Sequence, residues 1–549
     1  MFKKLFIAAA VIAVLLLVAV VVIQKVAGPS DGARLVPEDT VFFASFVDLP
    51  RSLFRWQSTS LAQIAKEPEV RAFLEKPMAR LQADPGAGET GKILGGLKPG
   101  RIFVAVTEVT RDSVDALVGF QYWGGRQEFD AAVNRMRREL PPGEVTTENH
   151  EGNEITVSRH DKFTTYSATL GRWGFVSTSG GLLKSALDRV AGKSKTPSLA
   201  EGERFQTVSK KMLAAPDFLF FLQPQKVLDV LLETGRALGA ESIPEQVEEF
   251  RATEAVGGSL KLDGALQRDA LFLMRKAAKP AENLTHKTAR FTGGATVVFI
   301  DFLARFSGLP ALLEKALADA APQASIVEFA GLAAAAYGPE CALVVNWENG
   351  QMTPSGVLAV EIRNQEKADE ALKKLISFFP ETRIVDDQGI LLYSIPSVSN
   401  PLATPTLTLT DRFLLFGIDA SSVSRAARAA GPELVGLPAF APALPAYHSA
   451  NEVFAFVDTG AIFERAYTAL RPVILFGAQV MPAAADMIDT AKLPATETIS
   501  RHLPPVILSQ QRLEDGVLLE SSGPITASEL AIAAAAGGVI SASKGTPVR

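Results

Sequence analysis

Runs of apolar residues separated by short polar turns predict strands and helices in a mixed order along this chain. Gly171–Ser179 has the aromatic and β-branched content of a strand, and Gly180 and Gly181 interrupt it. Apolar residues with helical spacing follow at 182–190. After a second helical stretch, an aromatic strand is predicted at 217–222. This order of strand, helix and strand is the most informative pattern in the sequence.

The same order of elements recurs about 240 residues later. A strand is predicted at 411–418, a helix at 421–430 and a strand at 452–457. Other elements correspond at separations of about 235 to 256 residues, so the pattern predicts an internal duplication. The corresponding ranges are 41–47 with 295–300, 101–106 with 342–345, 116–122 with 356–362, the helix 127–140 with 368–378, the strands 144–170 with 382–409, and the closing pair 258–274 with 506–521.

These patterns predict an α+β protein with two similar halves, each an antiparallel sheet packed with helices. We place the first half at residues 35–280 and the second at 281–524. A period this long indicates two domains rather than a solenoid. Many strands are apolar throughout, which predicts sheets that are buried on both faces or packed between the halves. An Ala/Gly-rich tail follows at 525–549, and its uncharged run is too short to span a membrane.

The beginning of the chain has the pattern of a membrane anchor. Leu5–Ile23 contains 19 residues without a charge. A helix of this length spans about 28 Å, close to the thickness of a bilayer core. Val26-Ala27-Gly28 is a poor cleavage site, which favours an uncleaved anchor over a signal peptide. We therefore predict a transmembrane signal-anchor helix at 1–27.

The charges around this segment predict its orientation. Lys3 and Lys4 precede it, and basic residues are retained on the cytoplasmic side. Lys25 on the far side weakens this bias without reversing it. A polar linker at 28–34 then leads to the folded part. The expected protein is a single-pass protein of the inner (cytoplasmic) membrane, with its bulk on the periplasmic or extracytoplasmic side.

Composition describes a globular protein and argues against one class of partner. Hydrophobic residues make up 47% and charged residues 21% of the chain, as in folded proteins. The net charge is −5 with both signs interspersed, so we expect no nucleic-acid partner. The single cysteine, Cys341, excludes an intrachain disulfide and lies in an apolar run, where a buried side chain is expected.

Candidate catalytic and ligand-binding motifs are weak. Gly86–Lys92 has the spacing of a phosphate-binding loop, but Ile93 replaces the hydroxyl residue that binds magnesium. Gly95 and Gly96 also oppose the helix that such a loop requires. Ser177–Ser179 lacks the elbow of a serine hydrolase. We expect a flexible loop at 86–92 and no catalytic or cofactor-binding residues.

Histidines offer little support for a metal site. No two of them have the spacing of a helical ligand pair. His150 and His160 flank a predicted hairpin with acidic residues nearby, but the matching turn of the second half has no histidine. We therefore predict no metal site and no cofactor. The histidines are His150, His160, His286, His448 and His502.

The start of the folded part resembles a known but uncharacterised family. Leu35-Val-Pro-Glu-Asp-Thr-Val-Phe-Phe-Ala-Ser-Phe-Val-Asp-Leu49 is followed by Trp56 and by Glu67-Pro-Glu-Val-Arg-Ala-Phe-Leu74. These stretches resemble a bacterial domain of unknown function, whose exported, N-terminally anchored members open with Leu-Pro-x-Asp-Thr before an aromatic strand. Trp173-Gly-Phe-Val-Ser-Thr-Ser179 is similar to the same family. The resemblance implies an exported, anchored protein and no site residues.

The sequence supports three hypotheses about function. We expect first a membrane-tethered, non-enzymatic binding or scaffolding protein of the bacterial cell envelope, because an anchor and a duplication are present and no catalytic pattern is found. The second is a carrier whose curved sheets hold a lipid or another apolar ligand. The 32 phenylalanines among the aromatic residues suit either a dry core or such a cavity. An exported hydrolase is the third and least favoured.

Overall fold

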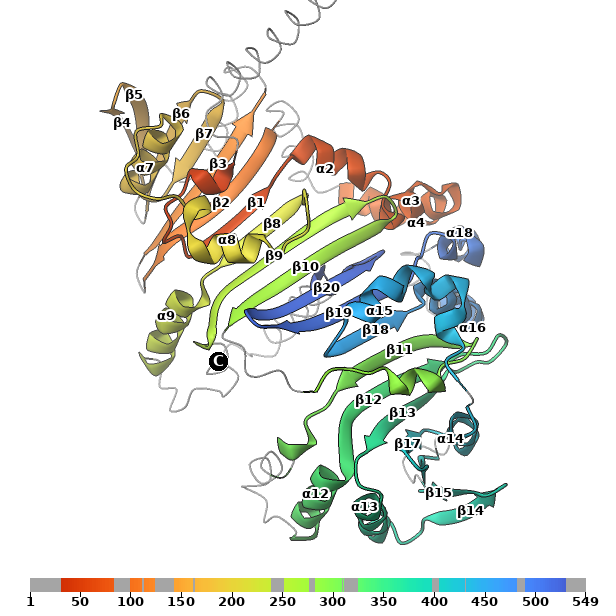
Figure 1. Cartoon of the computed structure of the whole chain (residues 1–549). Coiled ribbons are helices and arrows are strands. Elements are labelled where there is room, and N and C mark those ends of the chain that lie inside the picture. The colour runs from red at the N-terminus through yellow and green to blue at the C-terminus, as the bar shows by residue number, and fades with distance from the viewer. Residues whose placement is uncertain are drawn as a thin grey trace, which may run out of the picture.

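The chain folds around one long antiparallel sheet (Figure 1). The computed structural model describes residues 31–82, 99–110, 113–123, 143–160, 163–237, 251–275, 282–308, 310, 324–396, 404–429, 431–480 and 489–529. The predicted anchor, the loop at 86–92, the helix at 127–140 and most of the Ala/Gly-rich tail lie outside these residues. Within the described part, no helix is both long enough and apolar enough to cross a membrane.

The first half contributes strands β1–β10. They pair in the spatial order β4-β5-β6-β7-β3-β2-β1-β8-β9-β10, and each neighbouring pair is antiparallel. Their bounds are β1 (Phe42–Phe46), β2 (Pro99–Val109), β3 (Val114–Tyr122), β4 (Glu144–His150), β5 (Asn153–Arg159), β6 (Thr164–Leu170), β7 (Trp173–Ser177), β8 (Phe218–Leu222), β9 (Thr253–Asp263) and β10 (Leu266–Arg275).

The second half contributes strands β11–β20 in the corresponding order, β14-β15-β16-β17-β13-β12-β11-β18-β19-β20. Every strand βn of the first half therefore occupies the position of strand βn+10 in the second. The bounds are β11 (Thr296–Leu303), β12 (Tyr337–Asn346), β13 (Ser355–Ile362), β14 (Arg383–Asp387), β15 (Ile390–Ser394), β16 (Thr406–Leu409), β17 (Phe413–Gly417), β18 (Val453–Val457), β19 (Val506–Leu513) and β20 (Gly516–Gly523).

The halves join edge to edge through β10 and β20. Gln267–Met274 pairs with Gly516–Gly523, so the 20 strands of the described residues form one sheet rather than one sheet for each half. The predicted α+β class with an antiparallel sheet is confirmed, whereas the expectation of separate sheets is corrected. A backbone edge that remained unpaired in each half would attract other strands, and this junction satisfies both edges at once.

A buried carboxylate marks the junction. Asp269 of β10 is almost fully buried and lies opposite Ser521 of β20. Its carboxylate accepts hydrogen bonds from the Ser521 amide (3.0 Å), the Ser521 hydroxyl (2.5 Å) and the Ser528 amide (2.9 Å). Hydrogen bonds to a charged group are stronger than neutral ones. Asp269 therefore stabilises the pairing of β10 with β20 and also holds the segment that follows β20.

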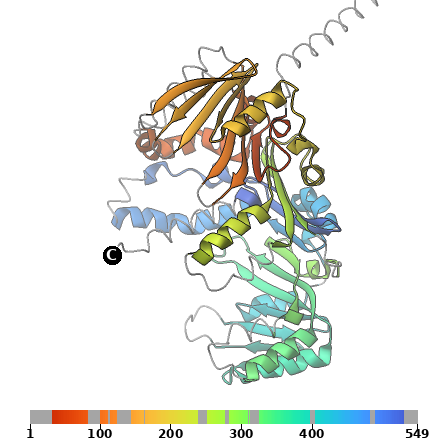
Figure 2. The same ribbon diagram turned by 90° about the vertical axis from the view of Figure 1, so that its left-hand side faces the viewer.

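Helices cover both faces of the sheet. Their bounds in the described residues are α2 (Leu49–Trp56), α3 (Ser60–Lys66), α4 (Pro68–Gln82), α7 (Gly180–Val190), α8 (Glu203–Ser209), α9 (Pro224–Ala237), α12 (Ala324–Ala336), α13 (Gln365–Ser377), α14 (Ala420–Ala427), α15 (Leu444–Ser449), α16 (Thr459–Val480) and α18 (Thr496–Ser500). Short 3-10 helices are η1 (Gly32–Arg34), η2 (Leu199–Glu201), η3 (Lys287–Phe291), η4 (Phe306–Gly308), η5 (Leu434–Gly436), η6 (Pro438–Ala443) and η7 (Thr490–Lys492). Figure 2 shows helices on either side of the sheet, with blue α16 extending away from it.

Two cores lie on the same face, which we call the core face. Helices α7 and α8 pack there in the first half, and α14 and α15 pack there in the second. Each fully buried phenylalanine of these cores contributes about 1.5–3 kcal/mol. Cross-strand partners share a face of a sheet. A row of cross-strand partners runs along this face from the first core to the second. In order, its residues are Leu219, Ser259, Ala270, Glu520, Ser509 and Phe454.

The opposite face, the outer face, carries two described helices in the second half. In the second half, α12 and α13 pack on it with small side chains such as Ala336 and Ala371, next to Val360 of β13. In the first half, Val104 and Val118 of the outer face each remain 37% exposed. Near the junction, α4 contacts the second half through Glu75, which pairs with Lys492 at 2.8 Å, and Glu67 just before α4 pairs with His502 at 2.6 Å.

Candidate functional site

Each half contains a groove in the corresponding place on the core face. The second-half groove lies between α14 and the segment 291–295 that precedes β11, and its volume is about 870 Å³. The first-half groove lies between α7 and the segment 37–39 that precedes β1, and its volume is about 970 Å³. Both volumes fall in the range of ligand-binding clefts, about 300–1,000 Å³.

The same structural elements build both grooves. One wall is the helix that follows β7 or β17, and the floor includes the adjoining ends of β2 and β3 or of β12 and β13. The loop after the helix closes the far end, at Thr196 and Pro197 in the first half and at Gly431 and Glu433 in the second. The duplicated strand and helix recognised in the sequence therefore form the wall of a duplicated concavity. Sequence patterns alone did not reveal this, because each groove also needs the segment before β1 or β11 and the ends of the two strands that follow it.

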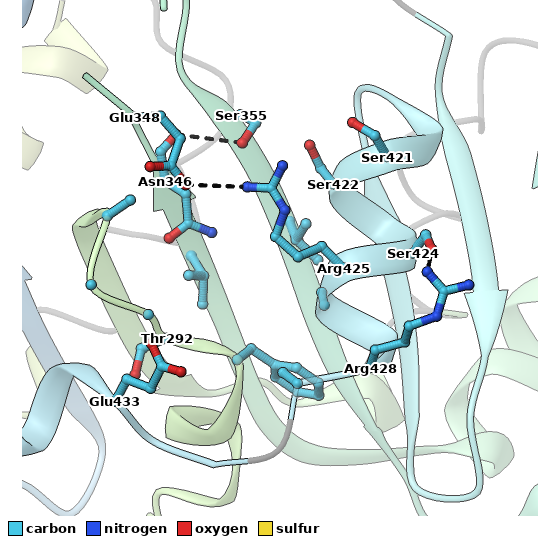
Figure 3. A pocket seen from close by; sticks show the side chains of 18 of the residues that line it. Thr292, Asn346, Glu348, Ser355, Ser421, Ser422, Ser424, Arg425, Arg428 and Glu433 are labelled. Atoms are coloured by element: carbon cyan, nitrogen blue, oxygen red, sulfur yellow. Dashed lines mark hydrogen bonds and ion pairs between the residues drawn. The ribbon is translucent and has the colours of Figure 1, made fainter. Parts of the chain in front are cut away.

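The second-half groove is lined by a capped helix N-terminus (Figure 3). The Asp419 carboxylate accepts hydrogen bonds from the Ser422 amide (2.8 Å) and from the hydroxyls of Ser421 (2.6 Å) and Ser422 (2.5 Å). Burial raises the pKa of Asp419, but these hydrogen bonds outweigh it and hold the pKa below its ordinary value. Asp419 is thus an ionised cap of α14, which satisfies amides that an anionic ligand would otherwise bind.

A second carboxylate in this groove is paired with an arginine. Asp387, at the end of β14, accepts from the Ser424 hydroxyl (2.5 Å) and pairs with Arg428 at 2.9 Å. The Ser424 hydrogen bond and then the Arg428 guanidinium lower the pKa of Asp387. Arg428 also donates to the Ser424 hydroxyl at 2.6 Å. This network ties α14 to the β14–β15 hairpin and fixes the shape of one side of the groove.

Arg425 is the charged group that faces the open part of the second-half groove. Its guanidinium lies 3.5 Å from Glu348, and both side chains are half exposed. Figure 3 shows Arg425 pointing from α14 toward the ends of β12 and β13, where Asn346 and Ser355 lie. The Ser355 hydroxyl donates to the Asn346 carbonyl at 3.4 Å. An exposed ion pair at this distance is weak, so Arg425 and Glu348 can both turn to a polar ligand.

The first-half groove has the same position but other side chains. Arg204 of α8 donates to Gln223 at 2.8 Å, and Lys226 donates to the Asp39 carbonyl at 3.3 Å. No helix cap corresponding to Asp419 is formed, because the side chain of Ser179 makes no capping hydrogen bond. The groove is more acidic than its counterpart. Its carboxylates are Glu38, Asp39, Glu108, Asp115 and Glu203.

The histidines serve local contacts in the described part of the chain. His150 pairs with Asp188 at 2.9 Å, and His502 pairs with Glu67. His160 and His448 make ring contacts with the adjacent aromatic residues Phe163 and Tyr447. Among the residues that the structure places, no group of three or more histidine, cysteine and acidic side chains could hold a metal ion.

His286 belongs to a buried polar cluster that the sequence did not predict. Its Nδ1 lies 2.8 Å from Asp301 of β11, and its ring stacks on Tyr447 at 3.9 Å. Burial is the main cause that raises the pKa of Asp301. Glu340 of β12 accepts from the amides of Thr285 and Thr288. The cluster fastens the segment before β11 to the sheet.

Cys341 and Ser177 have structural roles. Cys341 is 2% exposed, and burial raises the pKa of its thiol to about 12, so it is not a nucleophile at neutral pH. The Ser177 hydroxyl lies 2.8 Å from the Ala116 carbonyl oxygen and 2.9 Å from the Ser179 carbonyl oxygen, and its one proton is shared between them. These hydrogen bonds close the end of β7 against β3.

Comparisons with known proteins do not name a family for this chain. No protein-family model and no curated protein matches it. Solved structures of TP0453 are similar over part of the chain. Crystal form III is 12% identical and covers 46% of this chain and 82% of its own, with a TM-score of 0.26; crystal form I is 10% identical and covers 46% and 81%, with a TM-score of 0.25. Similarity at this level carries no argument about function.

Proposed function

We propose that this protein is a non-enzymatic binding protein of the bacterial cell envelope, with a ligand site in each of its two grooves. The main observation behind this proposal is that each half forms a groove in the corresponding position from the same elements, although the lining side chains differ. An N-terminal transmembrane helix at Leu5–Ile23 tethers the two halves to the inner membrane, and the bulk lies on its extracytoplasmic side.

The chemistry of the grooves favours binding over catalysis. A general acid or base needs a pKa near the working pH. Asp387 and Asp419 instead have lowered pKa values and are held by serine hydroxyls or by Arg428. Such groups remain ionised and oriented, which suits recognition of a polar ligand. The ion pair between Arg425 and Glu348 supplies one donor and one acceptor for it.

The two grooves can be blocked separately, which gives the decisive test. Gly181 and Gly294 line the first-half and second-half grooves. A Cβ added at Gly294 has no neighbour within 4 Å, and one added at Gly181 meets only the Ser179 hydroxyl, at 4.0 Å. Native mass spectrometry of the detergent-solubilised chain should show two copies of a co-purified or screened polar ligand. Gly181→Trp and Gly294→Trp should each lose one copy, and the double variant both. Unchanged binding in the double variant would contradict the proposal.

Protease accessibility in intact and permeabilised cells tests the orientation, and a cytoplasmic bulk would contradict the envelope location.

A carrier of a lipid or another apolar ligand is the second candidate. The partly exposed outer face of the first half supports it, since Val104 and Val118 are register neighbours there and Phe46 is exposed on the adjacent strand. The same mass spectra separate the two functions. A stoichiometric lipid that survives both glycine substitutions would favour the carrier, because the grooves lie on the opposite face.

A further inference from the structure

Helix α2 turns apolar side chains toward the solvent, unlike an ordinary surface helix. Surface helices normally turn their apolar side chains toward the core and their polar side chains toward water. In α2, Leu53 is 58% exposed, Phe54 80% and Trp56 40%, whereas Ser52 is buried. Phe46, at the end of β1 just before α2, is also exposed. The apolar residues of this segment therefore form an outward patch, which we call the α2 patch (Phe46, Leu53, Phe54 and Trp56).

Polar contacts explain why α2 holds this orientation. Asp217, which is buried next to β8, accepts from the Ser52 hydroxyl at 2.8 Å and pairs with Arg55 at 3.1 Å. Its second oxygen also accepts from the Leu262 amide at 2.8 Å. Asp48 caps the helix by accepting from the Arg51 amide. Because a buried carboxylate must keep its partners, α2 cannot rotate its apolar residues inward without losing them.

The position of the patch matches a bilayer surface. Asp31 lies 3.4 Å from Arg101, and both Asp31 and Val47, the residue before the α2 cap, line one cavity at this end of β1. Asp31 is only eight positions after Ile23, the end of the apolar run. Fully extended, this stretch reaches at most about 28 Å. The end of β1 where α2 begins (Figure 1) is therefore kept close to the membrane.

The composition of α2 also fits this partner. The helix contains no acidic residue and carries Arg51 in addition to Arg55, which pairs with Asp217. Helices that lie in the membrane interface combine aromatic and leucine side chains with basic residues, and tryptophan is enriched at that depth. A protein partner would need a complementary groove, whereas a bilayer offers an apolar layer and anionic headgroups together.

We propose that α2 lies in the interfacial layer of the membrane to which the chain is tethered, with Leu53, Phe54 and Trp56 among the acyl chains. The helix then acts as a second contact that fixes the orientation of the sheet above the bilayer. This inference rests on the tether of the proposed function.

A depth-sensitive label tests the inference in the full chain. The protein is reconstituted through its anchor into nanodiscs of phosphatidylethanolamine and phosphatidylglycerol. Phe54→Cys carries an environment-sensitive fluorophore, and native Cys341 is too buried to react. Ile384→Cys on the edge strand β14 is the matched control, because Ile384 is apolar and 60% exposed. Emission from position 54 should shift to shorter wavelength and fall at least about twofold with nitroxide lipids, since interfacial residues lie at acyl-chain depth. Position 384 should respond to neither.

A further variant and two contrary results complete the test. Leu53→Glu in the Phe54→Cys background should abolish the blue shift while the thermal transition is kept, because Leu53 contributes little to the core. A label at position 54 that reports water in nanodisc-bound protein would overturn the inference and leave the tether standing. A chain that does not enter nanodiscs at all would refute the tether and the inference with it.

Discussion

At the scale of single residues, the surroundings of each carboxylate decide its chemistry. Hydrogen bonds from serines lower the pKa values of Asp387 and Asp419 at the second-half groove, although burial opposes the shift. Glu520, in the middle of the sheet next to the junction, is different, because burial raises its pKa. The only hydrogen bond described for its carboxylate is a long one from Gln511, at 3.4 Å. Burial therefore raises the pKa of one carboxylate in this chain, whereas hydrogen-bond donors lower the pKa of the other two.

Glu520→Gln should stabilise the protein at neutral pH. A raised pKa in the folded state means that ionising Glu520 costs more there than in the unfolded chain, so stability is lost as the pH rises through the folded pKa. The variant avoids this loss. Its free energy of unfolding should exceed that of the wild type at pH 7 by less than about 1 kcal/mol, because solvent screens a half-buried group. The difference should vanish below the ordinary value of 4.5.

Urea denaturation at several pH values measures this difference. Glu381→Gln, at an exposed position, controls for the general loss of a negative charge. A Glu520→Gln variant that is less stable than the wild type at pH 7 would show that the carboxylate makes a favourable interaction there.

At the scale of elements, corresponding helices in the two halves form with different local support. Helix α14 begins with Asp419, whose side chain caps Ser422, whereas α7 begins with Ser179, whose side chain makes no capping bond. Helix α7 compensates with more apolar burial, through Leu182, Leu183 and Leu187. The corresponding groove-wall helices are therefore stabilised differently: α14 by its N-cap and α7 by its apolar contacts with the core.

Removal of the two N-cap side chains should consequently have unequal effects. Asp419→Ala should lower the free energy of unfolding by about 0.5–2 kcal/mol, the usual cost of a lost N-cap. Ser179→Ala, the matched control, should change it little. Chemical denaturation compares the two variants, and amide hydrogen exchange over 420–424 locates the effect. Equal losses in both variants would show that capping is not the difference between these helices.

At the scale of the whole molecule, the β10–β20 junction makes the halves depend on each other. Eight residue pairs run from Gln267 with Gly523 to Met274 with Gly516. Without the second half, β10 would present an unpaired edge that includes Leu271 and Leu273. Such an edge is a template for another strand.

A fragment of residues 31–280 should therefore self-associate. Its β10 edge lacks β20, and antiparallel pairing with a second copy would restore the missing hydrogen bonds. Light scattering after size-exclusion chromatography should show dimers or larger species. Leu271→Lys with Leu273→Lys should shift the fragment toward monomer, since lysine protects edge strands. A monomeric unmodified fragment would indicate that the junction is not needed to satisfy this edge.

Local patterns determined most of the secondary structure. The strands predicted within 144–170 are observed as β4, β5 and β6, and the helix predicted at 182–190 is α7. The helix predicted at 421–430 ends earlier, at Ala427. These elements have alternating or helical spacing of apolar residues, and nearest-neighbour preferences suffice to specify them. The repeated order of strands follows from the same patterns.

Only the tertiary structure decided how these elements are used. The sequence predicted a sheet in each half, but the union through β10 and β20 depends on strand edges, which carry no side-chain pattern. The grooves need segments more than 100 residues apart, such as Thr292 and Arg425. The outward patch of α2 depends on Asp217, over 160 residues from Ser52 and Arg55. A pattern shows which side of a helix is apolar, whereas the partners available in three dimensions decide which side is buried.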